Sequence, residues 1–330
     1  MNKTLSTLIA ILLIGGVFVT GGYALYLHEK SPVLTLGHGL DTAHPVHLSL
    51  VHMKKRLAEI SDGQLTMNIY PGGVLGSEVQ SIEQLQKGRL AMTSQSAASI
   101  ENFIPSMKTF GLPYVFRDSD HFWKVLDGDV GNELMRKGDD KLVRGLCYFD
   151  SGSRNFYTKD KPIRTPDDLK GVHIRVMNSA TAIEMVKALG GKPTPISFGE
   201  LYSALAQGTV EGAENNPPSF YSSKHFEVCK HFSRDGHTRV PDILLISKKV
   251  WDTLSPEEQG WVAQAAKEAS VFQRELWKKS SESALEKAAA EGVQIYDVDT
   301  AAFAEKVQPM LDAIEDEEIR KLLDRISEVQ

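Results

Sequence analysis

The sequence predicts two lobes of mixed α/β structure, braced by one long helix. At 330 residues the chain is longer than a typical single domain and suits two linked domains of ordinary size. Strand-like runs alternate with helical patterns along most of the chain, which is typical of α/β lobes. Residues 256–291 carry an uninterrupted helical pattern, about 50 Å long at 1.5 Å per residue, so this helix could reach both lobes.

The composition is that of a chain able to bury a full core. Hydrophobic residues make up 42% of the chain and charged residues 24%, and the formal net charge is −6. Both signs of charge are interspersed along the sequence, so there is no electrostatic footprint for nucleic acid. The net charge alone therefore does not indicate what the protein binds.

The first 27 residues are predicted to be an export segment. Lys3 precedes an apolar run over residues 8–27, and Gly22 and Ala24 place small residues where a signal peptidase reads. We expect cleavage after Ala24 and a soluble body in the periplasm. Because the run approaches the ~20 residues that cross a bilayer, a retained membrane anchor is the alternative.

Periodicity and capping residues predict the first elements in order. Apolar residues at helical spacing indicate a helix over 45–60, and alternation indicates a strand over 65–70. Ser77 and Gln80 form a capping box for the next helix, which stops at Gly88. The order at the start of the chain is therefore helix, strand, helix.

Strands and helices continue to alternate in the rest of the chain. Ser197 with Glu200 is expected to cap a short helix, and Ser255 with Glu258 to open the long one. Further strand-like runs lie at 90–93, 142–149, 156–159, 172–177 and 242–247. We find no internal repeat.

Two arginines are candidates for binding an anion. Arg154 leads into one predicted strand, and Arg175 lies on the next, on the face opposite Ile174 and Val176. We expect the two arginines to approach one region from adjacent strands. An arginine fork matches a carboxylate bidentately, most strongly where water is excluded. The alternative is a solvated strand face or a structural salt bridge.

Two amides, Asn215 and Asn216, precede the rigid turn at Pro217. Asparagine offers both donors and acceptors, which suits a ligand with hydroxyl groups. From spacing alone, a role of these amides in satisfying backbone groups of the turn is the favoured interpretation.

In combination these segments resemble the solute-binding proteins of tripartite ATP-independent periplasmic (TRAP) transporters, the DctP-type family. The resemblance covers nearly the whole chain after the export segment. The residues that carry it are Pro71 to Glu78, Gly111 to Asp118, Ser153-Arg154, Arg164 to Gly171, Ile174 to Val176, Phe198 to Leu205, Glu211 to Asn216, His237-Thr238 and Leu254 to Gln259.

This resemblance implies a two-lobed periplasmic binding protein fold with a hinge. We expect residues 28–151 with 241–281 in the first lobe, and 152–240 with 282–330 in the second. In such proteins the arginine at the position of Arg175 clamps the ligand carboxylate, the one at Arg154 assists, and the amide at Asn215 lies between the lobes. The resemblance also implies membrane permease subunits as partners, no cofactor and a monomer.

The branch that captures hexuronates such as glucuronate and galacturonate is the most similar. It implies first-lobe contacts from Glu78 and from His38 or His44. Where that branch has an aromatic after the paired asparagines this chain has Pro217, so stacking on the ligand is expected from Phe220. The remaining expected ligand contacts are Asn178, Asn216 and His237. A C4-dicarboxylate or another organic acid is the alternative ligand.

An enzymatic function has weaker support in the sequence than ligand binding. The glycines from Gly72 to Gly76 lie where a phosphate loop could be, but they match neither nucleotide-binding fingerprint, so a tight turn is expected. His38, His44, His47 and His52 lack the spacing of a zinc hydrolase, and we expect no metal. Cys147 and Cys229 have no activating signature; two buried free thiols are favoured over a disulfide. We therefore expect a binding protein and not an enzyme.

Overall fold

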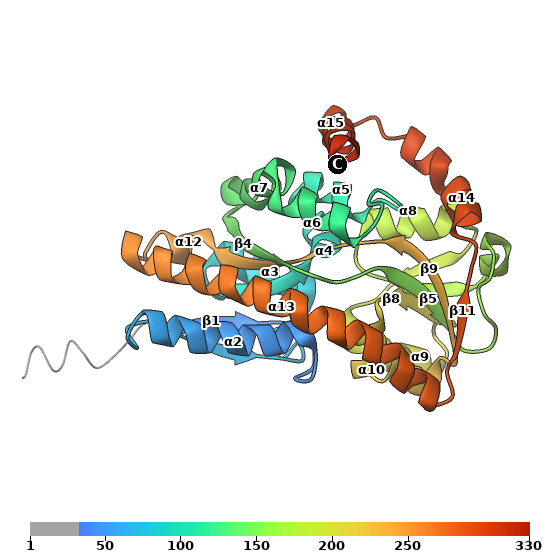
Figure 1. The fold of residues 1–330 in the computed structure, drawn as a ribbon, viewed down its shortest axis with the longest axis horizontal. Helices are drawn as coiled ribbons and strands as arrows, with labels where there is room; N and C mark the ends of the chain where they lie inside the picture. The colour runs from blue at the N-terminus through green and yellow to red at the C-terminus, as the bar shows by residue number, and fades with distance from the viewer. Residues whose placement is uncertain (1–32) are drawn as a thin grey trace, which may run out of the picture.

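The computed structural model describes residues 33–330 and contains two β-sheets, each covered by helices (Figure 1). The predicted export segment lies outside the described residues. The first sheet has the strand order β2-β1-β3-β10-β4. Its strands are β1 (Val33–Gly37), β2 (Thr66–Tyr70), β3 (Met92–Ser96), β4 (Val143–Phe149) and β10 (Asp242–Ser247).

The second sheet has the order β11-β9-β5-β8-β6-β7. Its strands are β5 (Arg154–Thr158), β6 (His173–Val176), β7 (Lys192–Pro195), β8 (Gly212–Asn215), β9 (His231–Thr238) and β11 (Gln294–Asp297). Both sheets are mixed: β10 runs antiparallel to β3 and β4, and β5 runs antiparallel to β8 and β9. The predicted two-lobed α/β fold is thus confirmed.

Helices cover both sheets. They are α2 (Pro45–Ile60), α3 (Glu78–Lys87), α4 (Ala97–Ile100), α5 (Lys108–Gly111), α6 (Ser119–Asp127), α7 (Asp129–Arg136), α8 (Ala180–Ala188), α9 (Phe198–Gln207), α10 (Pro217–Ser222), α11 (His225–Val228), α12 (Lys248–Trp251), α13 (Pro256–Ala290), α14 (Thr300–Asp312) and α15 (Glu317–Glu328). Short 3-10 turns lie at 105–107, 139–141 and 166–169. The helices predicted over 45–60 and 256–291 are confirmed.

Three connections before α14 join the lobes. The chain passes from the first sheet to the second between β4 and β5, and returns between β9 and β10. Helix α13 runs along both lobes (Figure 1), packing on α2 and β4 at one end and on α10 at the other. Its N-terminus has the predicted capping box of Ser255 and Glu258. The two strand connections are short, at residues 150–153 and 239–241.

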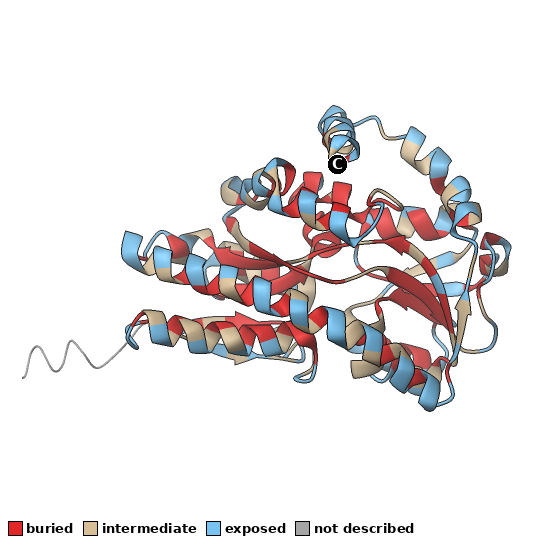
Figure 2. Cartoon of the chain, in the orientation of Figure 1, coloured by how far each residue is buried: buried red, intermediate tan, exposed pale blue. Residues whose placement is uncertain are grey.

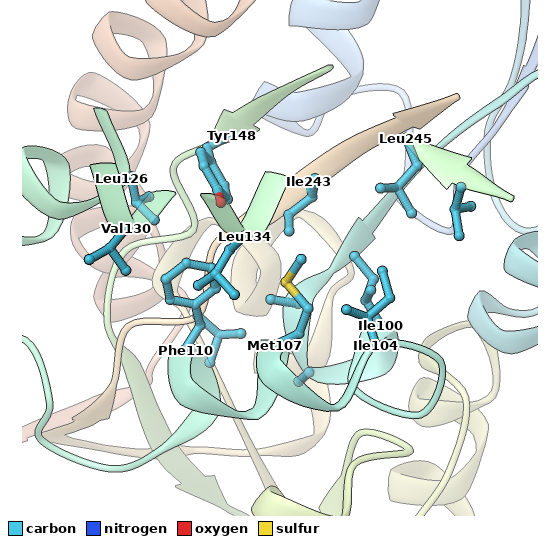
Figure 3. Close-up of a cluster of buried hydrophobic side chains, with 14 of the residues drawn as sticks. Ile100, Ile104, Met107, Phe110, Leu126, Val130, Leu134, Tyr148, Ile243 and Leu245 are labelled. Carbon is cyan, nitrogen blue, oxygen red and sulfur yellow. The ribbon is translucent and has the colours of Figure 1, made fainter. Parts of the chain in front are cut away.

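Apolar side chains from the strands and from the inner faces of the helices form the cores, and exposed residues lie on the outer faces (Figure 2). In the first lobe, Phe110 and Leu134 pack with Ile243 and Tyr148 beneath the sheet (Figure 3). The C-terminal helix α15 adds Leu322 and Ile326 to this cluster. We propose that the lobe boundaries predicted above hold up to α14, with α15 belonging to the first lobe.

Other local predictions can be checked directly. Cys147 and Cys229 are free and buried. The segment from Gly72 to Gly76 is a tight turn, in which the amides of Gly72 and Gly73 donate to the carbonyls of Leu40 and His38 and are not free for a phosphate. Within residues 33–330, none of the helices has the length and apolar character needed to cross a bilayer.

Candidate functional site

A small cavity lies between the two lobes and encloses about 60 Å³. Ligand pockets for drug-sized molecules enclose roughly 300–1,000 Å³, so this one suits a small ligand. Its lining comes from both sheets and is rich in polar side chains: Gly39, Leu40, Glu78, Ser94, Gln95, Ser96, Ser99, Ser151, Arg154, Arg175, Met177, Phe198, Asn215, Asn216, Ser219 and Asp242.

Arg175 supplies an unsatisfied cationic donor to this cavity. Ile174 and Val176 on β6 belong to the apolar core, which leaves Arg175 on the other face of the strand. The Arg175 side chain is 1% exposed, its Nε donates to the carbonyl of Ile196 at 2.7 Å, and its buried Nη1 has no partner. Burial lowers the pKa of Arg175. A buried charge without a partner is costly, so a ligand carboxylate would satisfy this group.

Arg154 also lines the cavity, but its donors are already engaged. It forms a two-pronged ion pair with the carboxylate of Glu214, and its Nη1 donates to Oδ1 of Asn215 at 2.9 Å. The prediction that Arg154 and Arg175 lie on adjacent strands is wrong, because β8 runs between β5 and β6. Strand β8 carries Glu214, whose buried carboxylate pairs with the guanidinium of Arg154.

Glu214 belongs to a buried chain of charges. Burial alone would raise its pKa, but the charge and hydrogen bonds of Arg154 and His237 outweigh this and lower the pKa to about 2. Burial would lower the pKa of His237, but Asp235, at 2.6 Å from its Nδ1, and Glu214 raise it to about 9. His237 does not line the cavity. It positions Glu214, and through it Arg154.

The amides divide their roles. Oδ1 of Asn215 accepts from Arg154 and from the backbone of Asn216, while its Nδ2 has no acceptor among residues 33–330. The side chain of Asn216 caps α10 and donates to Ser151 at 3.3 Å. Asn215 can therefore offer a donor to a ligand, whereas Asn216 is largely occupied in the turn.

Glu78 reaches the cavity from the first lobe. Its Oε1 accepts a hydrogen bond from the backbone N–H of Phe198 at 3.0 Å, where α9 begins in the second lobe. The predicted cap from Ser197 is wrong in this detail: Ser197 occupies the N-cap position, but its side chain makes no capping bond. The start of α9 is instead satisfied by a carboxylate from the other lobe.

Besides His237, four predicted contacts lie away from the cavity lining. Nε2 of His38 lies 3.0 Å from Nδ1 of His47, and the pKa of His38 is lowered to about 3, mainly because the ring is buried. Phe220 is fully buried and packs on Tyr157 and Phe232, so it offers no face to a ligand. The carbonyl of Asn178 accepts from Asn102. The fourth, His44, is not part of the lining but contacts the lining residue Ser219.

The histidines near the start of the described chain make separate contacts. Nε2 of His44 lies 3.1 Å from Oγ of Ser219, which lines the cavity, and burial lowers the pKa of His44 to about 4. His52 stacks on Phe272. Across residues 33–330, no three His, Cys, Asp or Glu side chains are grouped so as to hold a metal ion.

Strand β3 contributes lining residues that sequence reasoning missed. Ser94, Gln95 and Ser96 all line the cavity, and the buried Oγ of Ser94 has no partner. The available signal was the composition of the strand, Met-Thr-Ser-Gln-Ser, because a central strand that is mostly buried seldom carries four polar residues in succession.

Asp242 was missed as well. It begins β10, an otherwise apolar strand that pairs with β3 and β4. Burial and the charge of Asp150 raise its pKa to about 7, although Arg154 acts in the opposite direction. A carboxyl at the start of an apolar central strand was the signal that could have found it.

A second carboxylate joins the lobes outside the cavity. Glu101, just after α4, accepts hydrogen bonds from Oγ of Ser179 at 2.8 Å and from the N–H and hydroxyl of Thr181 at 3.0 and 2.8 Å. Both partners lie at the start of α8, where a helix favours negative charge. Together, Glu78 and Glu101 hold two helix N-termini of the second lobe against the first lobe.

Comparisons with known proteins agree with this architecture. Residues 36–318 match the sequence model of "Bacterial extracellular solute-binding protein, family 7". A solute-binding protein from Chromohalobacter salexigens is 33% identical, with 87% of each chain covered.

Two solved structures are also similar. One is a TRAP periplasmic solute-binding protein from Xanthobacter autotrophicus with bound β-D-galacturonate, at 35% identity, a TM-score of 0.88, and 90% of this chain and 100% of that chain covered. The other is such a protein from Pseudomonas putida with bound D-glucuronate, at 36% identity, a TM-score of 0.86, and coverage of 91% and 98%.

Proposed function

This chain belongs to family 7 of the bacterial extracellular solute-binding proteins, and from that premise we propose that it captures a hexuronate such as glucuronate or galacturonate. It would deliver this ligand to the permease subunits of a TRAP transporter. Its role would be binding and release without a reaction, performed as a monomer in the periplasm. The ligands of the two similar structures support this choice of ligand class.

The observation that carries the proposal is the buried, unpartnered Nη1 of Arg175 in a cavity between the lobes. The ligand carboxylate would bind this guanidinium, while Nδ2 of Asn215 and the serines of β3 would meet the hydroxyl groups. Glu78 would accept from a hydroxyl with its second oxygen. Arg154 would act through Glu214 and Asn215, by holding both in place.

Closure would follow from contacts that need both lobes. A ligand shifts the balance between open and closed forms only through interactions made better in one of them. Arg175 belongs to the second lobe, whereas Ser94 and Glu78 belong to the first. A hexuronate that touches both sets would therefore favour hinge closure.

The proposal is tested by isothermal titration calorimetry of the mature chain with glucuronate, galacturonate and glucuronamide, in which a neutral amide replaces the carboxylate. Arg175→Ala should weaken uronate binding by about 2–5 kcal/mol, roughly 30-fold to several thousand-fold, because a buried carboxylate loses its partner. The control is Arg164→Ala, which removes an exposed arginine that lies over Tyr296. Equal affinity for glucuronamide and glucuronate, or an unchanged affinity in Arg175→Ala, would reject the proposed carboxylate clamp.

A further inference from the structure

The charged groups that line the cavity differ in how many of their hydrogen-bonding atoms already have a partner in the protein. Arg154 is paired with Glu214, and one oxygen of Glu78 accepts from Phe198. Arg175 keeps a free donor, and among residues 33–330 no donor reaches the carboxyl of Asp242. Among the described residues, the cavity therefore offers a ligand one buried cationic donor with no partner and one carboxyl with both oxygens free.

These two groups lie in different electrostatic surroundings. The charges that act on Asp242 are those of Arg154 and Asp150, whereas Glu78 and Glu214 are the carboxylates that act on Arg175. The neighbours of Asp242 across β3 and β4 are Ser96 and Phe149, which carry no charge. A ligand carboxylate held by Arg175 would thus leave the remainder of the ligand to meet Asp242.

The structure assigns to Asp242 the choice between ligand classes: its carboxylate accepts hydrogen bonds from ligand hydroxyl groups and repels a second ligand carboxylate. This inference rests on the proposed function, because it takes Arg175 as the partner of the first carboxylate. A polyhydroxy acid with one carboxylate would satisfy both groups. A dicarboxylate of the same length would place like charges together in the cavity between the lobes, where their repulsion is stronger than in bulk water.

The raised pKa of Asp242 makes this role dependent on pH. Its pKa of about 7 means that the carboxyl is about half protonated in the empty site at neutral pH. Hydroxyl donors favour the ionised form, so uronate binding should weaken as pH falls below 7, by up to tenfold per pH unit. A second ligand carboxylate would favour the protonated form, so dicarboxylate binding should change in the opposite direction.

Calorimetric titrations between pH 5.5 and 8.5 test this inference on the wild type, on Asp242→Asn and on Asp160→Asn. Asparagine keeps the shape of the neutral carboxyl, and Asp160 is an exposed residue that controls for the loss of one charge. The probes are glucuronate and the matched pair gluconate and glucarate, which differ only in a terminal hydroxymethyl or carboxylate. Circular dichroism and melting temperature show that each variant is folded.

We expect Asp242→Asn to bind glucuronate at least tenfold more weakly than the wild type at pH 8 and to lose most of the pH dependence. It should also bind glucarate more tightly than the wild type does. Wild-type affinity for glucuronate in Asp242→Asn at pH 8, or a wild type that prefers glucarate to gluconate at that pH, would overturn the inference. Absence of uronate binding to the wild type at every pH would refute the proposed function itself, and the inference with it.

Discussion

Replacing Glu101 by Gln should weaken ligand binding although Glu101 does not line the cavity. The carboxylate accepts three hydrogen bonds from Ser179 and Thr181 across the lobe interface and is 8% exposed. A hydrogen bond to a charged group contributes about 1.5–3 kcal/mol, and charge at a helix N-terminus about 0.3–1 kcal/mol. Glutamine keeps one acceptor oxygen, so we expect a loss of about 1.5–3 kcal/mol, close to one charged hydrogen bond.

If these bonds form only when the lobes close, the loss appears in the affinity for ligand. It corresponds to roughly 10- to 150-fold weaker binding of glucuronate, measured by calorimetry. Glu184→Gln is a matched control, because Glu184 pairs with Lys108 across the same interface but its side chain is 51% exposed. An exposed pair contributes at most about 1 kcal/mol. Equal affinities for the Glu101 and Glu184 variants would show that Glu101 does not act on closure.

Two further predictions concern stability. The pKa of His237 is raised to about 9, so its charged form stabilises the fold below pH 6.5 and this contribution is lost as pH rises through 9. The melting temperature should therefore fall between pH 7 and 9, and His237→Gln should flatten that fall; parallel curves would refute the charge assignment. Leu36→Ala leaves a cavity at a fully buried position on β1. It should lower the free energy of unfolding, measured by urea titration, by about 2–5 kcal/mol. A smaller loss would mean that neighbouring side chains move into the cavity.

Much of the fold could be predicted from the sequence because local signals agreed with the final packing. The capping box at Ser77, the stop at Gly88 and the long helix after Ser255 all hold in the structure. Each of these features depends on residues within a few positions of one another. The free state of Cys147 and Cys229 likewise followed from their apolar surroundings.

The candidate site was predicted less completely because its geometry depends on sheet order. Sequence proximity suggested that the strands of Arg154 and Arg175 are neighbours, but β8 enters between them from a segment some forty residues further along the chain than Arg175. That insertion brings Glu214 against Arg154 and changes its role. In the same way, no local pattern could show that the N–H of Phe198 is bonded to Glu78, 120 positions earlier.

The placement of the acidic groups also bears on how tightly a ligand can be held. The Glu78 and Glu101 contacts are hydrogen bonds between groups of the protein itself, so part of the free energy of closure comes from the protein. A ligand that meets a largely preformed closed site loses less affinity to the conformational equilibrium. The same contacts must not be too strong, because a site that stays closed admits no ligand and releases none to a permease. On this reasoning, weakening Glu101 should lower affinity and speed release together, and stopped-flow dissociation measurements would show a faster off-rate as well as the higher Kd.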